Sequence, residues 1–302
     1  MKYKVTVLMS TYNGEKYIKQ QLDSIFNQKK VNVRVLVRDD GSVDKTQEIL
    51  DQYSKEKNLE WYSGENIRTA KSFVNLINHV SLDSDYYSFS DQDDVWQSTK
   101  LIKSIQKIKN IKGPALYAGN YNLVDSDLNP ISNTNMHMTT TSFNQALVYS
   151  CCTGCTVVIN KELLKDLRGK YPRYLFMHDD WIHKVCLGIG GKVVYDETPL
   201  MLYRQHSNNV EGGKHNFLDK VKKVANDKKN NTHIMRKQLE EIIRLYGHKL
   251  TSRNYNLAND IIRRSKGNLI VRTFLVFDPK YQITKSKKLN REFKISIILN
   301  YW

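Results

Sequence analysis

Three carboxylates within four positions, Asp91, Asp93 and Asp94, are the residues of this sequence best suited to carry out chemistry. They follow residues 85–89, an apolar run that predicts a buried strand. In α/β proteins ligands bind where such strands end, and hard oxygen ligands at this spacing suit Mg²⁺ or Mn²⁺ carrying a diphosphate. The alternative is an acidic turn that caps a helix beginning near Val95.

The elements before this cluster alternate between strand and helix. Residues 3–13 predict a strand followed by a helix that ends near Phe26, and residues 31–38 predict a second strand. The turn at 39–42 then leads into a helix pattern that reaches Tyr53. This alternation predicts βαβ units, a mainly parallel sheet and a functional edge at the strand ends.

Four motifs in this order resemble a known family. They are residues 7–14 (Val-Leu-Met-Ser-Thr-Tyr-Asn-Gly), 39–42 (Asp-Asp-Gly-Ser), 91–94 (Asp-Gln-Asp-Asp) and 178–181 (His-Asp-Asp-Trp). From residue 3 to about 210 the chain resembles a family 2 inverting glycosyltransferase with the GT-A fold. The form of residues 90–96 looks most like the rhamnosyltransferases and their relatives that build bacterial surface polysaccharides.

The resemblance implies a fold and a reaction. The fold is α/β, with a mixed, mainly parallel sheet flanked by helices. The reaction moves a sugar from a nucleotide-diphosphate donor to a glycan hydroxyl with inversion, commonly on a lipid-linked acceptor. We expect dTDP-rhamnose as the donor first and a UDP-hexose next. Mn²⁺ or Mg²⁺ would neutralise the leaving diphosphate.

The same resemblance assigns roles at the donor end. Asp93 is the expected direct metal ligand, and Asp91 faces the ribose or reaches the metal through water. His206 completes the metal shell or contacts the diphosphate. Asp39 is expected to accept a hydrogen bond from N3–H of uracil or thymine. Thr11 and Asn13, at the end of the first strand, would lie beside the nucleoside.

Three cations are candidates for the diphosphate. Arg204 lies in the motif that contains His206, and Arg68 and Lys71 lie before the acidic cluster. Relatives commonly have a glycine where Arg68 stands, and the role of this loop therefore stays open.

The proton acceptor is expected at residues 178–181. These residues open a helix pattern that runs to Leu187, and the dipole at a helix N-terminus stabilises a charged carboxylate. By resemblance Asp179 is the general base, and Asp180 is the second choice because a shift of one residue would exchange them. A simple N-cap is the alternative for either acid.

The net charge of +16 is concentrated in the last part of the chain. Residues 214–302 contain 21 Lys and Arg against 7 Asp and Glu, whereas residues 1–213 contain 26 against 24. We therefore expect a catalytic domain at 1–213 and a basic, amphipathic helical region at 214–302, with the boundary at Gly213. Basic amphipathic helices suit an anionic membrane surface. A solvated basic extension is the alternative, and no nucleic-acid module accompanies the charge.

Composition indicates a reducing compartment. The four cysteines, Cys151, Cys152, Cys155 and Cys186, have no histidine at zinc-finger spacing and suit small buried thiols. The N-terminus predicts a strand rather than a signal segment, and no uncharged run reaches the ~18 residues of a membrane span. We expect a cytoplasmic protein, peripheral on the inner face of the plasma membrane.

Two other functions stay open at this point. A nucleotidyltransferase would share the sheet and the acids, but residues 10–14 lack its Gly-rich basic phosphate loop. A non-enzymatic protein that binds membrane or polysaccharide through the tail would leave the internal acids unexplained. Residues 126–150 give no readable code for the acceptor, and the oligomeric state is open.

Overall fold

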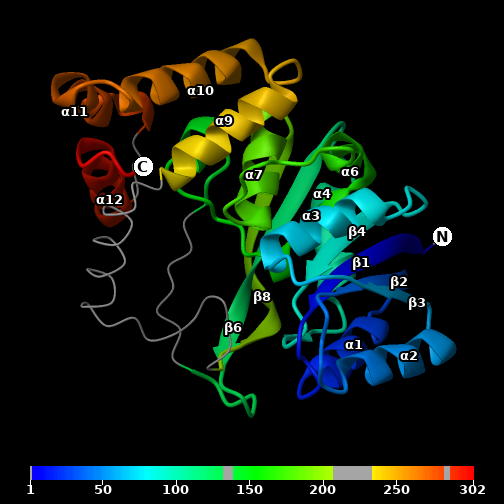
Figure 1. Ribbon diagram of the computed structural model, residues 1–302. Coiled ribbons are helices and arrows are strands. Elements are labelled where there is room, and N and C mark those ends of the chain that lie inside the picture. The colour runs from blue at the N-terminus through cyan, green and yellow to red at the C-terminus, as the bar shows by residue number, and fades with distance from the viewer. Residues whose placement is uncertain (1, 132–138, 207–232, 282–285) are drawn as a thin grey trace.

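A computed structural model describes residues 2–131, 139–206, 233–281 and 286–302. Its centre is an eight-stranded sheet in the order β3-β2-β1-β4-β7-β6-β8-β5 (Figure 1). The strands are β1 (Tyr3–Thr11), β2 (Val31–Asp39), β3 (Leu59–Ser63), β4 (Tyr86–Ser90), β5 (Val95–Trp96), β6 (Ala115–Val124), β7 (Val158–Asn160) and β8 (Lys192–Arg204). Strands β1 to β4 pair in parallel, as predicted, and so do β6 and β8. The pairs of β7 and β5 are antiparallel, which makes the sheet mixed.

Helices cover both faces of the sheet. They are α1 (Ile18–Phe26), α2 (Thr46–Glu56), α3 (Thr69–His79), α4 (Lys100–Ile108), α5 (Phe143–Ala146), α6 (Lys161–Leu167) and α7 (His178–Gly188), followed by α9 (Ile234–Tyr246), α10 (Ser252–Ser265), α11 (Leu269–Phe277) and α12 (Lys287–Ile298). Side chains alternate along β1, so that Val5 and Val7 pack with α1, α2 and α4, while Leu8 packs with α3, α6 and α7. Each face is therefore an apolar layer, and the polar strand ends meet at one edge.

The helix expected near Val95 begins later. Residues Val95–Trp96 instead form β5, which pairs with β8, and the backbone of Gln97 continues this contact by donating to the carbonyl of Leu200. Helix α4 begins at Lys100, so Asp93 and Asp94 do not cap it. The pairing with a strand about a hundred residues later in the chain overrides the local signal.

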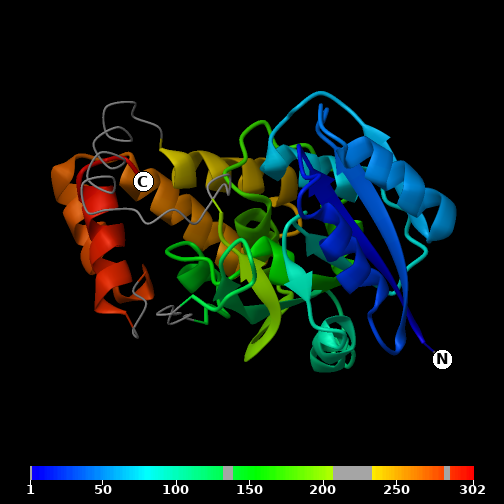
Figure 2. The same ribbon diagram turned by 90° about the horizontal axis from the view of Figure 1, so that it is seen from below.

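The C-terminal helices belong to the same hydrophobic core. Leu239, Ile242 and Tyr246 of α9 are buried in one cluster with Trp181 and Ile182 of α7. Figures 1 and 2 show α9 lying along α7, with α11 and α12 at the end of the molecule away from β3 and α2. The predicted boundary at residue 213 and the amphipathic pattern at 217–224 lie outside the described residues. Within the described residues, no helix is long and apolar enough to cross a membrane.

Candidate active site

The acidic cluster follows β4 and is tied to the end of β1. The side-chain amide of Gln92 accepts a hydrogen bond from Tyr12 N (2.9 Å) and donates to Tyr12 O (3.1 Å). Gly14 lies directly against this amide, and a side chain there would collide with it. The two loops are thus held as one unit, which places the acids at the carboxyl edge of the sheet.

Asp93 and His206, both predicted metal ligands, lie next to each other. Nε2 of His206 is 2.8 Å from the carboxylate of Asp93. The ring of Tyr17 stacks on His206 with centroids 4.9 Å apart. This aromatic contact fixes the imidazole beside the carboxylate.

Arg204 supports the loop that contains Asp93. Its Nε donates to the carbonyl of Asp93 (2.7 Å), Nη1 to the carbonyl of Ser126 and Nη2 to the side chain of Gln20 (both 2.5 Å). The guanidinium also lies over the ring of Tyr17 and is 2% exposed. Arg204 therefore braces the loop that contains Asp93, and its contact with phosphate stays a prediction.

Asp94 is the buried member of the cluster. Its carboxylate accepts from Arg204 N, and Asp91, Asp94 and Cys155 offer ligand atoms within 4.8 Å of one another. Burial raises the pKa of Asp94 well above its usual range, and the charges of Asp93 and Asp91 add to this shift. Its environment thus favours the neutral acid.

Asp39, the predicted base-reading residue, is completely buried at the end of β2. Its carboxylate accepts hydrogen bonds from Thr11 Oγ1, from the backbone and hydroxyl of Ser42 and from Gln47 Nε2. These donors use the acceptor capacity of a carboxylate. Asp39 and Thr11 therefore brace the turn, and their contacts with a nucleoside stay predictions.

Asn13 and Asp40 lie beside Asp39 and Thr11 at the same sheet edge. Asn13 has φ of +49°, is exposed, and receives a hydrogen bond from Val43 N on its side-chain oxygen. Asp40 forms a buried ion pair with Arg38. Asn13 and Asp40 thus lie where the ends of β1 and β2 meet.

Arg68 and Lys71 lie at the start of α3, and both are exposed. Arg68 has φ of +67°, in the region that glycine adopts most easily, which agrees with the glycine common in relatives. The loop from β3 to α3 leaves the same edge of the sheet as the other motifs, because Ser63 pairs with Asp39. Both cations are therefore accessible from that edge.

Asp179 occupies the first turn of α7 and is partly buried. Its carboxylate accepts from the backbone N–H of Gly154 (3.0 Å) and of Asp180 (2.8 Å). Both donors and the helix N-terminus stabilise the charged form. The side chain therefore sits as an oriented carboxylate between two segments of the chain.

His178 positions this turn. Its imidazole is buried, stacks on Phe73 of α3 at 4.0 Å and contacts Phe89 of β4. Burial lowers the pKa of His178 to about 3, so the ring is neutral. A Cβ on Gly154 would lie 2.5 Å from Nε2, and only glycine permits this approach. Gly154 therefore makes room for His178.

Asp180 points into the protein. It forms a buried ion pair with Lys184 (2.5 Å) and accepts a hydrogen bond from Gln238 of α9. Gln238 also accepts from Phe176 N at 2.8 Å. Asp180, the second choice for the base, thus joins α7 to the C-terminal helices instead of facing a reactant.

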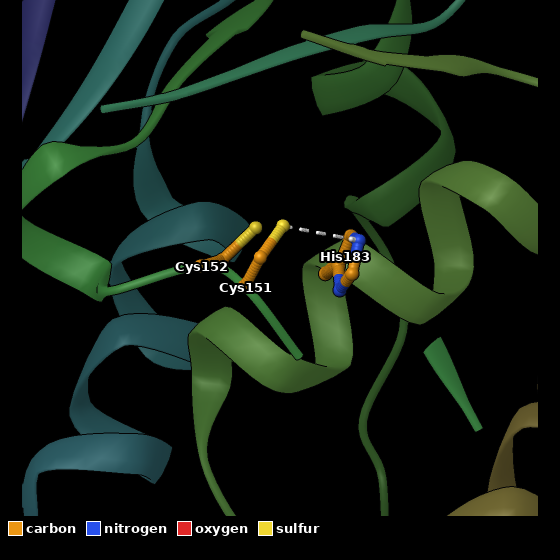
Figure 3. Close-up of side chains that lie close together, drawn as sticks. All are labelled: Cys151, Cys152 and His183. Carbon is orange, nitrogen blue, oxygen red and sulfur yellow. Dashed lines mark hydrogen bonds between the residues drawn. The ribbon is translucent and has the colours of Figure 1, made fainter. Parts of the chain in front are cut away.

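Cys151 and Cys152 lie beside His183 of α7 (Figure 3). Nδ1 of His183 is 3.0 Å from Ser150 Oγ, and Nε2 is 2.9 Å from Thr140 O and 4.0 Å from Cys151 Sγ. The hydrogen bond with Cys152 lowers the pKa of Cys151 to about 4; burial opposes this and His183 assists it. Both ring nitrogens are engaged by protein oxygens, so this group is satisfied as a polar network.

Comparison with known proteins identifies the family. The sequence profile described as Glycosyl transferase family 2 matches residues 6–168, which is more than half of the chain. The chain belongs to glycosyl transferase family 2. The prediction from the four motifs is thereby confirmed.

Individual proteins agree with this assignment. A dTDP-rhamnosyl transferase, RfbG, from Shigella flexneri is 31% identical over 237 residues, covering 72% of this chain and 78% of that protein. S. aureus TarS in complex with UDP superposes with a TM-score of 0.59 at 18% identity, covering 100% of this chain and 89% of that one. The mannosyltransferase PcManGT from Pyrobaculum calidifontis, solved with GDP-Man and Mn²⁺, superposes with a TM-score of 0.55 at 14% identity, covering 100% of this chain and 88% of that one. The fold of the family 2 chain is therefore GT-A, as predicted, with a helical C-terminal region.

Several supporting residues were not predicted. Gln92 lies inside the acidic motif, and its type alone did not show that it would bridge two loops. Tyr17 and Lys184 read as ordinary helix positions. Gln238 is 58 residues from Asp180, its partner, and no local pattern marks that contact.

Proposed function

We propose that this family 2 glycosyltransferase transfers a sugar, with inversion, from a nucleotide-diphosphate donor to a hydroxyl of a lipid-linked glycan in bacterial surface polysaccharide synthesis. The name of RfbG favours dTDP-rhamnose as the donor, and a UDP-hexose comes next because TarS was solved with UDP. The observation that carries the proposal is the contact of Asp93 with His206 beside the matched family motifs. The segment Gly154–Cys155 supports it, because Gly154 N donates to Asp179 and Cys155 lies beside Asp91 and Asp94.

On the nucleoside side, the base-reading role moves from Asp39 to Asp40. The carboxylate of Asp39 is already hydrogen-bonded by Thr11, Ser42 and Gln47. Among the described residues, Asp40 pairs with Arg38 alone, and a carboxylate can accept from N3–H of uracil or thymine. Asn13 would lie beside the same base.

The donor set fits a divalent cation. The carboxylate of Asp93 and the imidazole of His206 are adjacent, and both are ligands that Mn²⁺ accepts. Asp91 would join them through water or hold the ribose. A bound Mn²⁺ or Mg²⁺ would neutralise the charge that develops on the leaving diphosphate. Arg68 and Lys71, exposed at the start of α3, would attract the same phosphates.

Asp179 is the proposed base. The acceptor oxygen bonds to the anomeric carbon while the bond to the diphosphate oxygen breaks, and Asp179 takes the hydroxyl proton. Its hydrogen bonds with Gly154 and Asp180 hold the carboxylate in one orientation before substrate arrives. Asp180 has a structural role in this proposal because its ion pair with Lys184 is buried.

We place the reaction on the cytoplasmic side of the plasma membrane, with the protein peripheral to it. A lipid-linked acceptor presents its glycan at the bilayer surface, and the basic C-terminal region suits anionic lipid. Nucleic acid has no part in this proposal.

Hydrolysis of a donor panel tests the function. The purified full chain is incubated with dTDP-rhamnose, UDP-glucose, UDP-GlcNAc and GDP-mannose, with Mn²⁺ or with a chelator. We expect one donor to be cleaved only with metal, and Asp93→Ala to reduce that rate roughly 10²–10³-fold. Calorimetry should show that Asp93→Ala loses the gain in nucleotide affinity that Mn²⁺ gives. The proposal would be contradicted if Mn²⁺ raised the nucleotide affinity of Asp93→Ala as much as that of wild type. A product with retained anomeric configuration would also contradict it.

A further inference from the structure

Helix α11 exposes an apolar face. Ile270, Phe274 and Phe277 recur at i, i+4 and i+7 and are 66%, 71% and 63% exposed. The opposite side of the helix carries Leu275 and Val276, which are buried in the core. The helix is therefore fixed by one side and presents large apolar groups on the other. We refer to Ile270, Phe274 and Phe277 as the α11 face.

A basic helix, α12, packs beside this face. Residues 266–302 contain eight Lys and Arg against two Asp and Glu. Nζ of Lys294, on α12, lies 4.9 Å from the ring centroid of Phe277, and Lys288 and Arg291 on the same helix are exposed. Helix α12 adds two half-exposed apolar residues, Ile295 and Leu299. The pattern is an apolar face with a basic helix along one side, and we refer to Lys288, Arg291 and Lys294 of that helix as its cationic rim.

The charge and geometry around the α11 face indicate which kind of partner binds there. A second copy meeting this face about a two-fold axis would bring two cationic rims together, which is unfavourable. Nucleic acid would match the rim but not exposed Ile and Phe side chains. An anionic bilayer matches both, because headgroups carry negative charge and the acyl boundary accepts apolar side chains.

We propose that the α11 face is the membrane-docking surface of this protein and that it binds anionic phospholipid bilayers. Ile270, Phe274 and Phe277 enter the acyl boundary, while Lys288, Arg291 and Lys294 meet the headgroups. The nine residues of α11 lie along the surface and do not cross it. The docking proposal rests on the proposed function in one respect, because a lipid-linked acceptor gives the enzyme a reason to be at the membrane.

Packed helices connect the end of the molecule that carries the α11 face to Asp179, the proposed base. Figures 1 and 2 place α11 and α12 at the end of the molecule opposite α2. Helix α10 packs against both α11 and α9, and Gln238 of α9 holds the turn that contains Asp179. A protein docked through α11 therefore keeps a fixed relation between the bilayer and the site.

Vesicle sedimentation tests the proposal. The full chain is mixed with vesicles of phosphatidylcholine and phosphatidylglycerol in equal parts, and with pure phosphatidylcholine. We expect binding to the anionic vesicles only, with partial release by salt, which screens lysines but not inserted side chains. The triple variant Ile270→Ser/Phe274→Ser/Phe277→Ser should bind the anionic vesicles at least about tenfold more weakly than wild type. Tyr171→Ser, which removes an aromatic that is 64% exposed outside α11 and α12, is the matched control and should bind as wild type.

Other results would overturn the proposal. These are equal binding of the triple variant and wild type, equal binding to both vesicle types, or a wild-type dimer in light scattering that the triple variant abolishes. Nucleotide affinity is measured on the same proteins without vesicles. If the triple variant no longer binds vesicles but keeps its affinity for the donor nucleotide, the role of the α11 face in docking is supported. If wild type binds vesicles but no nucleotide sugar, the proposed function fails and the docking face stands.

Discussion

Asp179 and Asp180 are adjacent in sequence and lie in different environments. Asp179 is a partly buried carboxylate held by two backbone N–H groups, and we expect Asp179→Asn to lower turnover roughly 10²–10⁴-fold with donor affinity nearly unchanged. Steady-state rates and calorimetry of the donor nucleotide measure the two quantities. Loss of donor affinity in parallel with turnover would argue against a role as base.

Asp180→Asn should act on stability. The change leaves the charge of Lys184 buried without its partner, and breaking such a pair costs about 3–5 kcal/mol. Urea unfolding should show this loss, while the folded fraction keeps a rate closer to wild type than Asp179→Asn does. If Asp180→Asn folds normally and loses more turnover than Asp179→Asn, the base is Asp180.

Lys100 is a buried cation beneath the acidic cluster. Nζ lies 3.5 Å from the ring centroid of Trp96 and 3.4 Å from Ser88 Oγ, and burial lowers the pKa of Lys100 from 10.5 to about 7. Between these pH values the unfolded chain binds a proton that the folded chain releases, so stability rises with pH across this window. Below pH 7 Lys100 is charged in the folded protein as well, and the free energy of unfolding is lowered by the full cost of burying that charge.

Lys100→Met should therefore stabilise the protein at pH 7, by about 1–4 kcal/mol, and remove the rise of stability between pH 7 and 10. Urea unfolding of both proteins at pH 7 and pH 9 checks this. A variant less stable than wild type at both pH values would show that Lys100 contributes favourable contacts as a charged group.

The start of α7 depends on contacts with two other elements. His178 fills the space above Gly154 and stacks on Phe73 of α3, so a methyl group at position 154 must displace the ring. We expect Gly154→Ala to cost about 1–3 kcal/mol by overpacking. Turnover should also fall, because displacing His178 shifts the turn in which Asp179 accepts a hydrogen bond from the backbone N–H at position 154. Thermal unfolding and rates measure the two effects.

A double-mutant cycle gives the control for this contact. In a His178→Ala background the added methyl group meets no ring, and Gly154→Ala should cost less there than in wild type. An equal cost in both backgrounds would show that backbone effects at position 154, and not His178, cause the loss.

Local sequence signals predicted most elements but not their partners. The period of β1 and α1 and the polar ends of the strands were sufficient to place the acidic cluster at a sheet edge. The short strand at Val95–Trp96 was missed because its cause is β8, about a hundred residues later in the chain. Asp39 and Arg204 were given ligand roles by resemblance to the family. Their hydrogen-bond partners in the structure include Thr11 and Gln20, and these contacts are set by tertiary packing that no motif encodes.

At the scale of the whole molecule, charge and core follow different divisions. The sequence separates a neutral part from a basic part near residue 213, whereas the hydrophobic core runs from α7 into α9 without a break. The basic region therefore supplies both a surface and an interior. Within the described residues, the change in composition therefore coincides with no break in the hydrophobic core.

A chain that ends at Gly213 should consequently fail to fold as the full chain does. It lacks Leu239, Ile242 and Tyr246, whose removal exposes Trp181 and Ile182, and it lacks Gln238 beside Asp180. We expect a broad, non-cooperative melting curve, loss of near-ultraviolet circular dichroism and no measurable binding of donor nucleotide. The full-length triple variant of the α11 face is the control, because it changes the same region without touching the core. If the shortened chain melts cooperatively near the temperature of the full chain and binds nucleotide, the C-terminal helices are an appendage and the contacts of α9 with α7 contribute little to stability.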